Sequence, residues 1–215
     1  MSMTDATTDG GRRQRSDGER SRRAILATAT RLASTRGLDR LSIGDLADEV
    51  GMSKSGLYAH FGSKEELQLA TIDAAEEIFD RVVVAPSEEA EPGLPAVLAL
   101  CDAFLDHLRD KVFPGGCFFA CASAEMHMQP GPVKDRIAEF DARWQARFLR
   151  NLEAARAAGE IAADADVDAL VFDLDALLYY AHGAFSFRDD PGVLHQARLS
   201  VRERLRRSGG TEPRA

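Results

Sequence analysis

Apolar residues recur at the spacing of an α-helix along almost the whole chain, and this periodicity constrains the fold most strongly. Residues 19–36 place Ile25, Ala29 and Leu32 on one stripe, the pattern of a helix with one buried face. No alternation typical of a β-strand competes with it, so the sequence predicts an all-α protein. In the second half the same periodicity predicts helices near 95–112, 117–128, 132–158, 166–187 and 192–207.

Three serines predict where short helices begin between residues 42 and 67. Ser42, Ser53 and Ser63 each precede an apolar run, and serine is a favoured N-cap residue because its hydroxyl accepts a free backbone N–H. Gly51 separates the first two runs and can adopt the positive φ of a tight turn. Two short helices joined by such a turn predict a helix-turn-helix, whose second helix projects its N-terminal residues outward, where they can enter the major groove of DNA.

The domain boundary is predicted near residue 64, where a longer fourth helix is expected to link two parts. Residues 19–64 are predicted to form a three-helix DNA-binding domain with a helix-turn-helix, and residues 65–208 a larger helical domain. Residues 1–18 and 209–215 lack apolar periodicity and are predicted to be flexible tails. The Pro- and Glu-rich segment 85–95 predicts a break after the fourth helix.

Charge is distributed unevenly along the chain. The net charge is −8, but residues 1–64 hold 11 Lys and Arg against 8 Asp and Glu, so that part carries +3. A weakly basic head on an acidic body is compatible with one face that binds nucleic acid. The chain has neither the ~20-residue apolar run of a membrane span nor an apolar secretory leader at its start. We therefore expect a cytoplasmic protein.

The candidate DNA-contacting residues gather at the start of the second helix of this motif and just beyond it. Helix N-termini attract phosphates, and short or cationic donors suit that position. Each residue also has a simpler interpretation: Ser53 is needed as a cap in any case, and Tyr58 could be a half-buried core aromatic. As a contiguous set they predict a DNA-binding surface made of Ser42, Ser53, Lys54, Ser55, Gly56, Tyr58, His60 and Lys64.

The stretch LADEVGMSKSGLYAHFGSKEEL resembles the tetracycline-repressor (TetR) family of transcription regulators. Leu57-Tyr58, His60-Phe61 and the following Lys64 carry the resemblance, which covers about residues 20–67. It implies that Ser42 and the stretch 53–56 lie against the backbone and bases of DNA. It also implies that Tyr58 and His60 bind phosphates and that Lys64 anchors the next helix to the DNA backbone.

One position departs from the family pattern. Gly44 stands where several members present a long polar side chain to DNA. This departure shifts the expected reading of bases onto Lys54 and Ser55 and leaves the operator sequence open.

The second half also resembles one branch of the family, in residues 114–126 and 131–144 and in the last two predicted helices. The resemblance implies that residues 65–208 bind a small-molecule effector and dimerise. It implies a homodimer whose helices near 166–187 and 192–207 form a four-helix bundle with those of the second subunit. The expected function is a repressor that binds a palindromic operator in double-stranded DNA and is released by an unidentified effector, with no cofactor.

Candidates for the effector pocket are aromatic, sulfur-containing and histidine side chains at helical spacing. Any one of them is more often ordinary core than ligand contact. His182, beside Tyr179, is the best candidate for a polar contact. The full set is Phe104, His107, Phe118, Phe119, Cys121, Met126, Trp144, Phe148, Tyr179 and His182.

Three alternatives stay open at this point. Cys117 and Cys121, four residues apart, could form a thiol- or metal-responsive site, although two thiols supply only half of the four ligands that structural zinc takes, and no metal is expected. A helical enzyme is less favoured because the sequence has neither a HExxH motif nor an ordered Ser, His and Asp set. A purely structural helical bundle is the third alternative.

Overall fold

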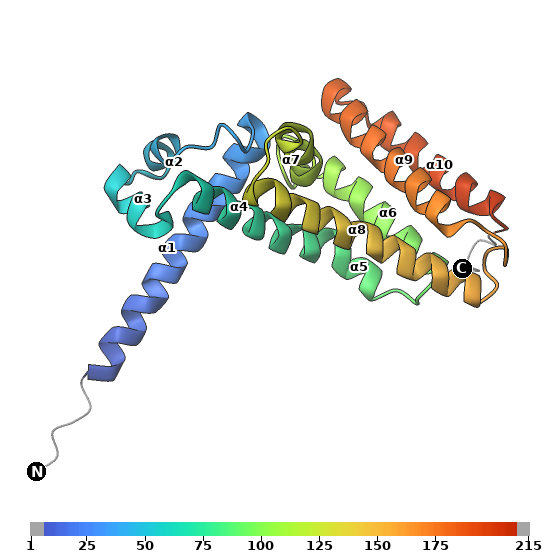
Figure 1. Cartoon of the computed structure of the whole chain (residues 1–215), viewed down its shortest axis with the longest axis horizontal. Coiled ribbons are helices and arrows are strands. Elements are labelled where there is room, and N and C mark those ends of the chain that lie inside the picture. Colours follow the sequence, from blue (N-terminus) through green and yellow to red (C-terminus); the bar gives the residue numbers. More distant parts are fainter. Residues whose placement is uncertain (1–6, 210–215) are drawn as a thin grey trace, which may run out of the picture.

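The computed structural model describes residues 7–209, and every regular element in this part of the chain is helical (Figure 1). The all-α prediction is confirmed. The elements are α1 (Thr7–Arg36), α2 (Ile43–Val50), α3 (Lys54–Phe61), α4 (Lys64–Phe79), the π-helical η1 (Asp80–Val84), α5 (Ala85–Glu88), α6 (Leu94–Arg109), α7 (Phe118–Met126), α8 (Pro132–Ala157), α9 (Val167–Arg188) and α10 (Pro191–Arg207).

The short helices α2, α3 and α4 begin where the capping serines predict. The hydroxyls of Ser42, Ser53 and Ser63 each accept the backbone N–H three residues further on, at 3.0–3.1 Å. Gly51 follows α2 with φ 68°, in the left-handed region. The Leu57 side chain is fully buried, so α3 is held against the core on one side and its other side faces outward. This is the expected helix-turn-helix.

A single buried core runs through the molecule, and α4 belongs to both halves of it. The helices α1, α2 and α3 lie at one end of the long axis, and α9 and α10 lie at the other (Figure 1). α4 packs on α1 and on α8, while α7 packs on α1 and α8 as well. Among the described helices, α4 and α7 therefore connect the end formed by α1, α2 and α3 to α8.

The N-terminal helix begins earlier than predicted. α1 starts at Thr7, so the prediction of a flexible tail is wrong for residues 7–18; residues 1–6 and 210–215 lie outside the described residues, and the tails stay a prediction there. Arg, Gln and Glu predominate in residues 12–20 and are good helix formers. A polar segment without an apolar stripe can thus be a solvated extension of an amphipathic helix.

The helix after Ser63 also extends further than expected. α4, η1 and α5 follow one another from residue 64 to residue 88, and the break falls only between α5 and α6. The Ala85 N–H bonds the carbonyl of Asp80, five residues back, in place of the usual four. Pro86 has no N–H, and its ring would press on the carbonyl four residues back in a regular α-helix; the wider π turn immediately before it relaxes this conflict.

Candidate DNA-binding surface and effector cavity

The outward end of α3 carries the side chains expected to contact DNA. Lys54 and Ser55 are exposed, and the Ser53 hydroxyl both caps α3 and lies 3.1 Å from the hydroxyl of Ser55. Tyr58 is 54% exposed, which argues against the simpler interpretation of a half-buried core aromatic. Gly56, half-buried, presents no side chain beside them. The structure therefore leaves this end of α3 free for a partner.

Lys54 lies across Gly44 of the preceding helix. Its Nζ and Cε are 3.3 and 3.4 Å from the position that a Cβ on Gly44 would occupy. The Ser42 hydroxyl is 3.7 Å from the same position, so the N-terminal ends of α2 and α3 meet here. The family departure at Gly44 thus provides the space that the Lys54 side chain uses.

Lys64 and His60 are placed differently from the rest of the set. The Lys64 ammonium donates to the carbonyl of Asp39 at 2.5 Å and lies 3.4 Å from the Asp39 carboxylate. The Arg22 guanidinium donates to the backbone carbonyl of the half-buried His60 at 2.7 Å. The same guanidinium lies 4.6 Å from the ring centre of Phe61. Sequence reasoning missed Arg22 and Asp39, because both reach the motif from elements distant in the chain.

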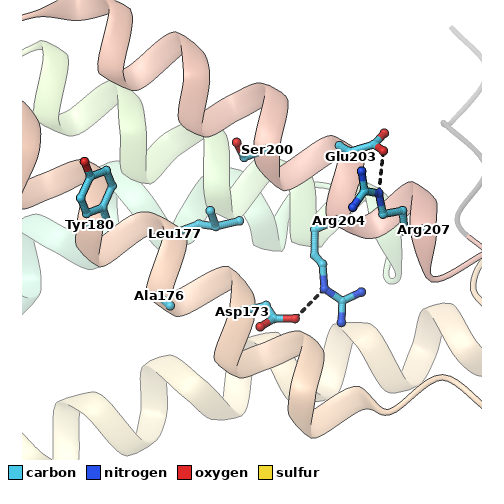
Figure 2. Close-up of a pocket in the computed structure, with 8 residues that line it drawn as sticks. All are labelled: Asp173, Ala176, Leu177, Tyr180, Ser200, Glu203, Arg204 and Arg207. Carbon is cyan, nitrogen blue, oxygen red and sulfur yellow. Dashed lines mark hydrogen bonds and ion pairs between the residues drawn. The ribbon is translucent and has the colours of Figure 1, made fainter.

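An open groove of about 570 Å³ lies between α9 and α10 at the opposite end of the molecule (Figure 2). Ion pairs brace it: Arg204 bonds Asp173 at 2.5 Å across the two helices, and Arg207 bonds Glu203 at 2.7 Å. The large exposed apolar side chains of α9 are Phe172, Tyr179, Tyr180 and Phe187. We call these two helices with their groove and exposed rings the α9–α10 face. Its groove is lined by Asp173, Ala176, Leu177, Tyr180, Ser200, Glu203, Arg204 and Arg207.

A second, smaller cavity of about 220 Å³ lies in the body and is walled by aromatic rings from several helices. Phe79 of α4 contacts the rings of Phe119, Phe140 and Trp144 edge-on, with ring centres 5.1–5.7 Å apart. We call it the aromatic cavity. Its lining residues are Phe79, Phe104, Cys117, Phe119, Ala120, Ser123, Phe140, Asp141, Trp144, Gln145, Asp175, Leu178 and Tyr179.

Four of the pocket candidates line the aromatic cavity: Phe104, Phe119, Trp144 and Tyr179. The other candidates do not line it; they are Phe118, Phe148, Met126, His107, Cys121 and His182, of which all but Cys121 are buried. Sequence reasoning missed Phe79, Phe140, Asp141 and Asp175. Only Phe140 carried a signal, because it stands four residues before Trp144 and eight before Phe148 on one helical stripe.

Two carboxylates give the aromatic cavity its polar part. The Trp144 indole N–H donates to Asp175 at 2.9 Å, and the Gln145 amide donates to Asp141 at 3.1 Å. Burial raises the pKa of the Asp141 carboxyl, and the charge of Asp175 raises it further. Within the described residues neither carboxylate forms an ion pair.

His107 lies behind the aromatic wall and is kept neutral. Its Nδ1 lies 2.5 Å from the carbonyl of Phe104, while its Nε2 is buried with no hydrogen-bond partner. Burial lowers the pKa of this imidazole to about 4. A proton on Nε2 would be an unpartnered buried charge, which explains the direction of the shift.

The cysteines have the properties of packed thiols. Burial raises the pKa of Cys117 to about 12 and also raises the pKa of Cys121, whose sulfur lies 3.7 Å from Nε2 of His182. A thiol reacts as the thiolate, so these shifts act against a redox-sensing role. Among the described residues, no group of three or more His, Cys, Asp and Glu side chains is placed to hold a metal ion. Nor is any helix in residues 7–209 long and apolar enough to cross a membrane.

The fold and the exposed recognition helix define a regulator of the helix-turn-helix class. Residues 25–71 match the profile of bacterial regulatory proteins of the tetR family, and residues 93–201 match that of the tetracyclin repressor-like C-terminal domain. The second match spans half of the sequence, so the chain belongs to the TetR family. It is a DNA-binding transcriptional regulator and not an enzyme, as the sequence predicted.

Relatives agree with this assignment. The HTH-type transcriptional regulator TtgR of Pseudomonas putida is 31% identical over 80 residues, which cover 37% of this chain and only 38% of TtgR. A TetR regulator from Chloroflexus aurantiacus superposes with a TM-score of 0.83 at 22% identity, covering 89% of this chain and 97% of that one. A regulator from Saccharomonospora viridis in complex with choline superposes with a TM-score of 0.72 at 23% identity, covering 87% of this chain and 96% of that one. At these identities the two solved structures establish the fold alone.

Proposed function

We propose that this regulator is a repressor that binds a palindromic operator as a homodimer and releases it when a small molecule enters the body. The observation that carries the proposal is the outward end of α3, where Lys54, Ser55 and Tyr58 are exposed on a helix fixed by its cap and its buried face. As a regulator of genes it would act in the cytoplasm.

We call the part of the molecule formed by α1, α2 and α3 the head. In this proposal its residues and the neighbouring Lys64 take different parts in DNA binding. Lys54 and Ser55 read bases in the major groove, since they stand at the exposed start of α3. Ser42, Ser53 and Gly56 let the two helix ends approach the DNA backbone. Tyr58 and His60 bind phosphates. Lys64 exchanges its bond to Asp39 for a phosphate when DNA is bound.

The α9–α10 face is the proposed contact between two copies of the chain. A soluble monomer rarely exposes several large apolar side chains along one helix, as Phe172, Tyr180 and Phe187 are exposed here. A single short recognition helix makes few base contacts, and two-fold symmetry doubles them at a spacing of about 34–36 Å along DNA. Both arguments favour a homodimer with one head at each half of the operator.

Release is proposed to pass through α4 and α7, which both line the aromatic cavity and reach the head. Phe79 of α4 and Phe119 of α7 are in its wall. Glu125, at the other end of α7, accepts the backbone N–H groups of Leu38 and Asp39 in the turn before α2, at 2.6 and 3.1 Å. A ligand releases DNA only if it binds the released state more tightly, and a 100-fold preference corresponds to about 2.7 kcal/mol.

Selection of bound fragments from the source genome tests this function. We expect recovery of a palindrome whose affinity falls with salt, with log K decreasing by about 0.9 per phosphate neutralised. Lys54→Ala should relax the preference at particular base pairs, because it removes a base contact, whereas Lys64→Ala should weaken all sequences alike. Recovery of no enriched sequence would contradict the function, and an unchanged salt slope in Lys64→Ala would contradict the phosphate contact.

A further inference from the structure

In the part of the chain that the structure describes, no cationic side chain in the wall of the aromatic cavity balances its two carboxylates. We propose that the ligand of this cavity is an organic cation, held between the aromatic rings and the carboxylates of Asp141 and Asp175. This inference rests on the proposed function in one respect, because it takes the ligand of the cavity to be the effector that releases DNA. The binding itself is independent of DNA.

The walls suit a cation with an apolar body. Rings of Phe79, Phe104, Phe119, Phe140, Trp144 and Tyr179 line the cavity. The faces of such rings are electron-rich and attract a cation, Trp most strongly, while they also exclude water from alkyl groups. Rings alone would accept a neutral apolar molecule as well, so the charged groups decide between the two classes.

The carboxylates favour the cation. Among the described residues, Asp141 and Asp175 accept side-chain hydrogen bonds only from the neutral donors Gln145 and Trp144, and no Lys, Arg or His side chain lines the cavity. The two charges are close enough for Asp175 to raise the pKa of Asp141. A cation between them would remove this repulsion and supply the missing opposite charge.

Several half-buried carboxylates at contacts between helices are paired with arginines in this chain. Glu76 is paired with Arg136 and Arg143, and Asp173 with Arg204. Asp102 is paired with two arginines in the same way, Arg198 and Arg202. The exposed Asp141 and the half-buried Asp175 have no such partner within the described residues, as is also true of Glu125 and Glu160, which accept backbone N–H groups. The two aspartates differ from those glutamates because they line a cavity walled by aromatic rings.

The same features exclude other ligand classes. An anion would meet two carboxylates and no cationic side chain, so it would be repelled. A bare metal ion would find only two charged oxygen ligands among aromatic rings, fewer than hard cations take. A cavity of about 220 Å³ has room for a small substituted ammonium ion and not for a long chain or a nucleotide.

Calorimetry on the full chain without DNA tests the inference. The probes are choline, tetraethylammonium and benzyltrimethylammonium, with dimethylbutanol as the neutral carbon analogue of choline and neopentylbenzene as that of benzyltrimethylammonium. We expect at least one cation to bind, and choline or benzyltrimethylammonium to bind at least tenfold more tightly than its neutral analogue. The double variant Asp141→Asn, Asp175→Asn should weaken the binding of the cation at least tenfold.

The variants are chosen to keep the local structure. Asparagine retains an oxygen that accepts the N–H groups of Gln145 and Trp144, and the two single variants are measured beside the double variant in case the latter does not fold. Glu139→Gln removes one negative charge from an exposed position of the same helix, α8, and is the control. It should leave the affinity for the cation unchanged.

Three results would overturn the inference: no binding of any cation, equal binding of the neutral analogues, or unchanged affinity in the foldable Asp variants. The effect on operator affinity is measured separately. A cation that binds in the expected way and leaves operator affinity unchanged would support the ligand class and contradict the proposed release mechanism.

Discussion

At Gly44 the missing side chain determines where a neighbouring residue can lie. The end of the Lys54 side chain occupies the space over Gly44, at 3.3 Å from where a Cβ would be. The side chain of a lysine is flexible, so a methyl group there would displace Lys54 rather than disrupt the packing of α2 against α3. The stability of the fold and the recognition of DNA should therefore respond differently to the same substitution.

Gly44→Ala is expected to stabilise the protein while weakening DNA binding. Alanine is more favourable than glycine by about 0.5–1 kcal/mol in a helix interior and by less at Gly44, in the first turn of α2, so the melting temperature should rise slightly. The affinity for the operator should fall because Lys54 is moved. Gly18→Ala in α1, where a Cβ would meet nothing within 4 Å, is the matched control for the helix effect alone. If Gly44→Ala leaves operator affinity and base preference intact, Lys54 is not positioned by Gly44.

His107 predicts a loss of stability in acid. Its folded pKa is about 4, below the ordinary value of 6.5, so the unfolded chain takes up this proton first as the pH falls. The contribution of His107 to the free energy of unfolding is therefore fully present above about pH 6.5 and is lost toward pH 4. Its size is on the order of 3 kcal/mol. Urea unfolding of the wild type and of His107→Gln across this range measures it.

The comparison with His107→Gln is needed because Asp141 acts in the opposite direction. Its raised pKa makes the folded state relatively more favourable as the pH falls. The difference between the two proteins isolates the histidine, since both contain Asp141. Parallel pH profiles of the wild type and His107→Gln would contradict the depressed pKa.

At the scale of elements, α7 is the link between the aromatic cavity and the head. Its wall residues Phe119 and Ser123 and its head contact Glu125 lie within two turns of one helix. Glu125 is the acceptor for two backbone N–H groups of the turn before α2, and Asp39 of that turn holds Lys64 at the start of α4. In the proposed release mechanism, a small displacement of α7 would be transmitted through these bonds to the start of α2 and to α4.

Glu125→Gln should loosen this turn. A glutamine has one accepting oxygen in place of two and no charge, so one of the bonds to Leu38 and Asp39 is lost, at a cost of about 1 kcal/mol. Hydrogen exchange of these two amides should accelerate, while exchange in α9 and α10 stays the same. Glu139→Gln is the control, because that glutamate is exposed on α8. Unchanged protection of both amides would show that Glu125 does not hold the turn.

At the scale of the whole molecule, the helix-turn-helix and the proposed dimer contact, the α9–α10 face, lie at opposite ends (Figure 1). Tyr180 is 66% exposed on the α9–α10 face, so replacing it should cost the isolated chain little (Figure 2). Tyr180→Glu is expected to convert a dimer into monomers and to lower operator affinity at least 100-fold. Sedimentation and DNA titration measure the two effects.

Leu149→Glu is the matched control for the dimer prediction. Leu149 is 39% exposed on α8, does not line the groove of the α9–α10 face, and receives the same change from an apolar to an acidic side chain. It should leave both the mass of the particle and the operator affinity unchanged. A Tyr180→Glu protein that stays dimeric would contradict the proposed interface.

The sequence alone was sufficient for the all-α class, the family and the short helices of the head. The N-caps at Ser42, Ser53 and Ser63 and the turn at Gly51 depend on backbone groups within a few residues, so local chemistry specifies them. The same local reasoning failed at the start of α1 and in the π-helical segment before Pro86. There, polar composition and a proline were compatible with more than one backbone conformation.

The tertiary structure alone decided which side chains share a site. The bond from Lys64 to Asp39 joins residues 25 positions apart, and the aromatic cavity collects rings from different helices and two carboxylates 34 positions apart. These contacts depend on how each helix is rotated about its axis and on the angle at which it crosses its neighbours. The periodicity of the sequence specifies neither of them. The residues expected to contact DNA could therefore be predicted from one segment, whereas the aromatic cavity could be recognised only after the helices were packed.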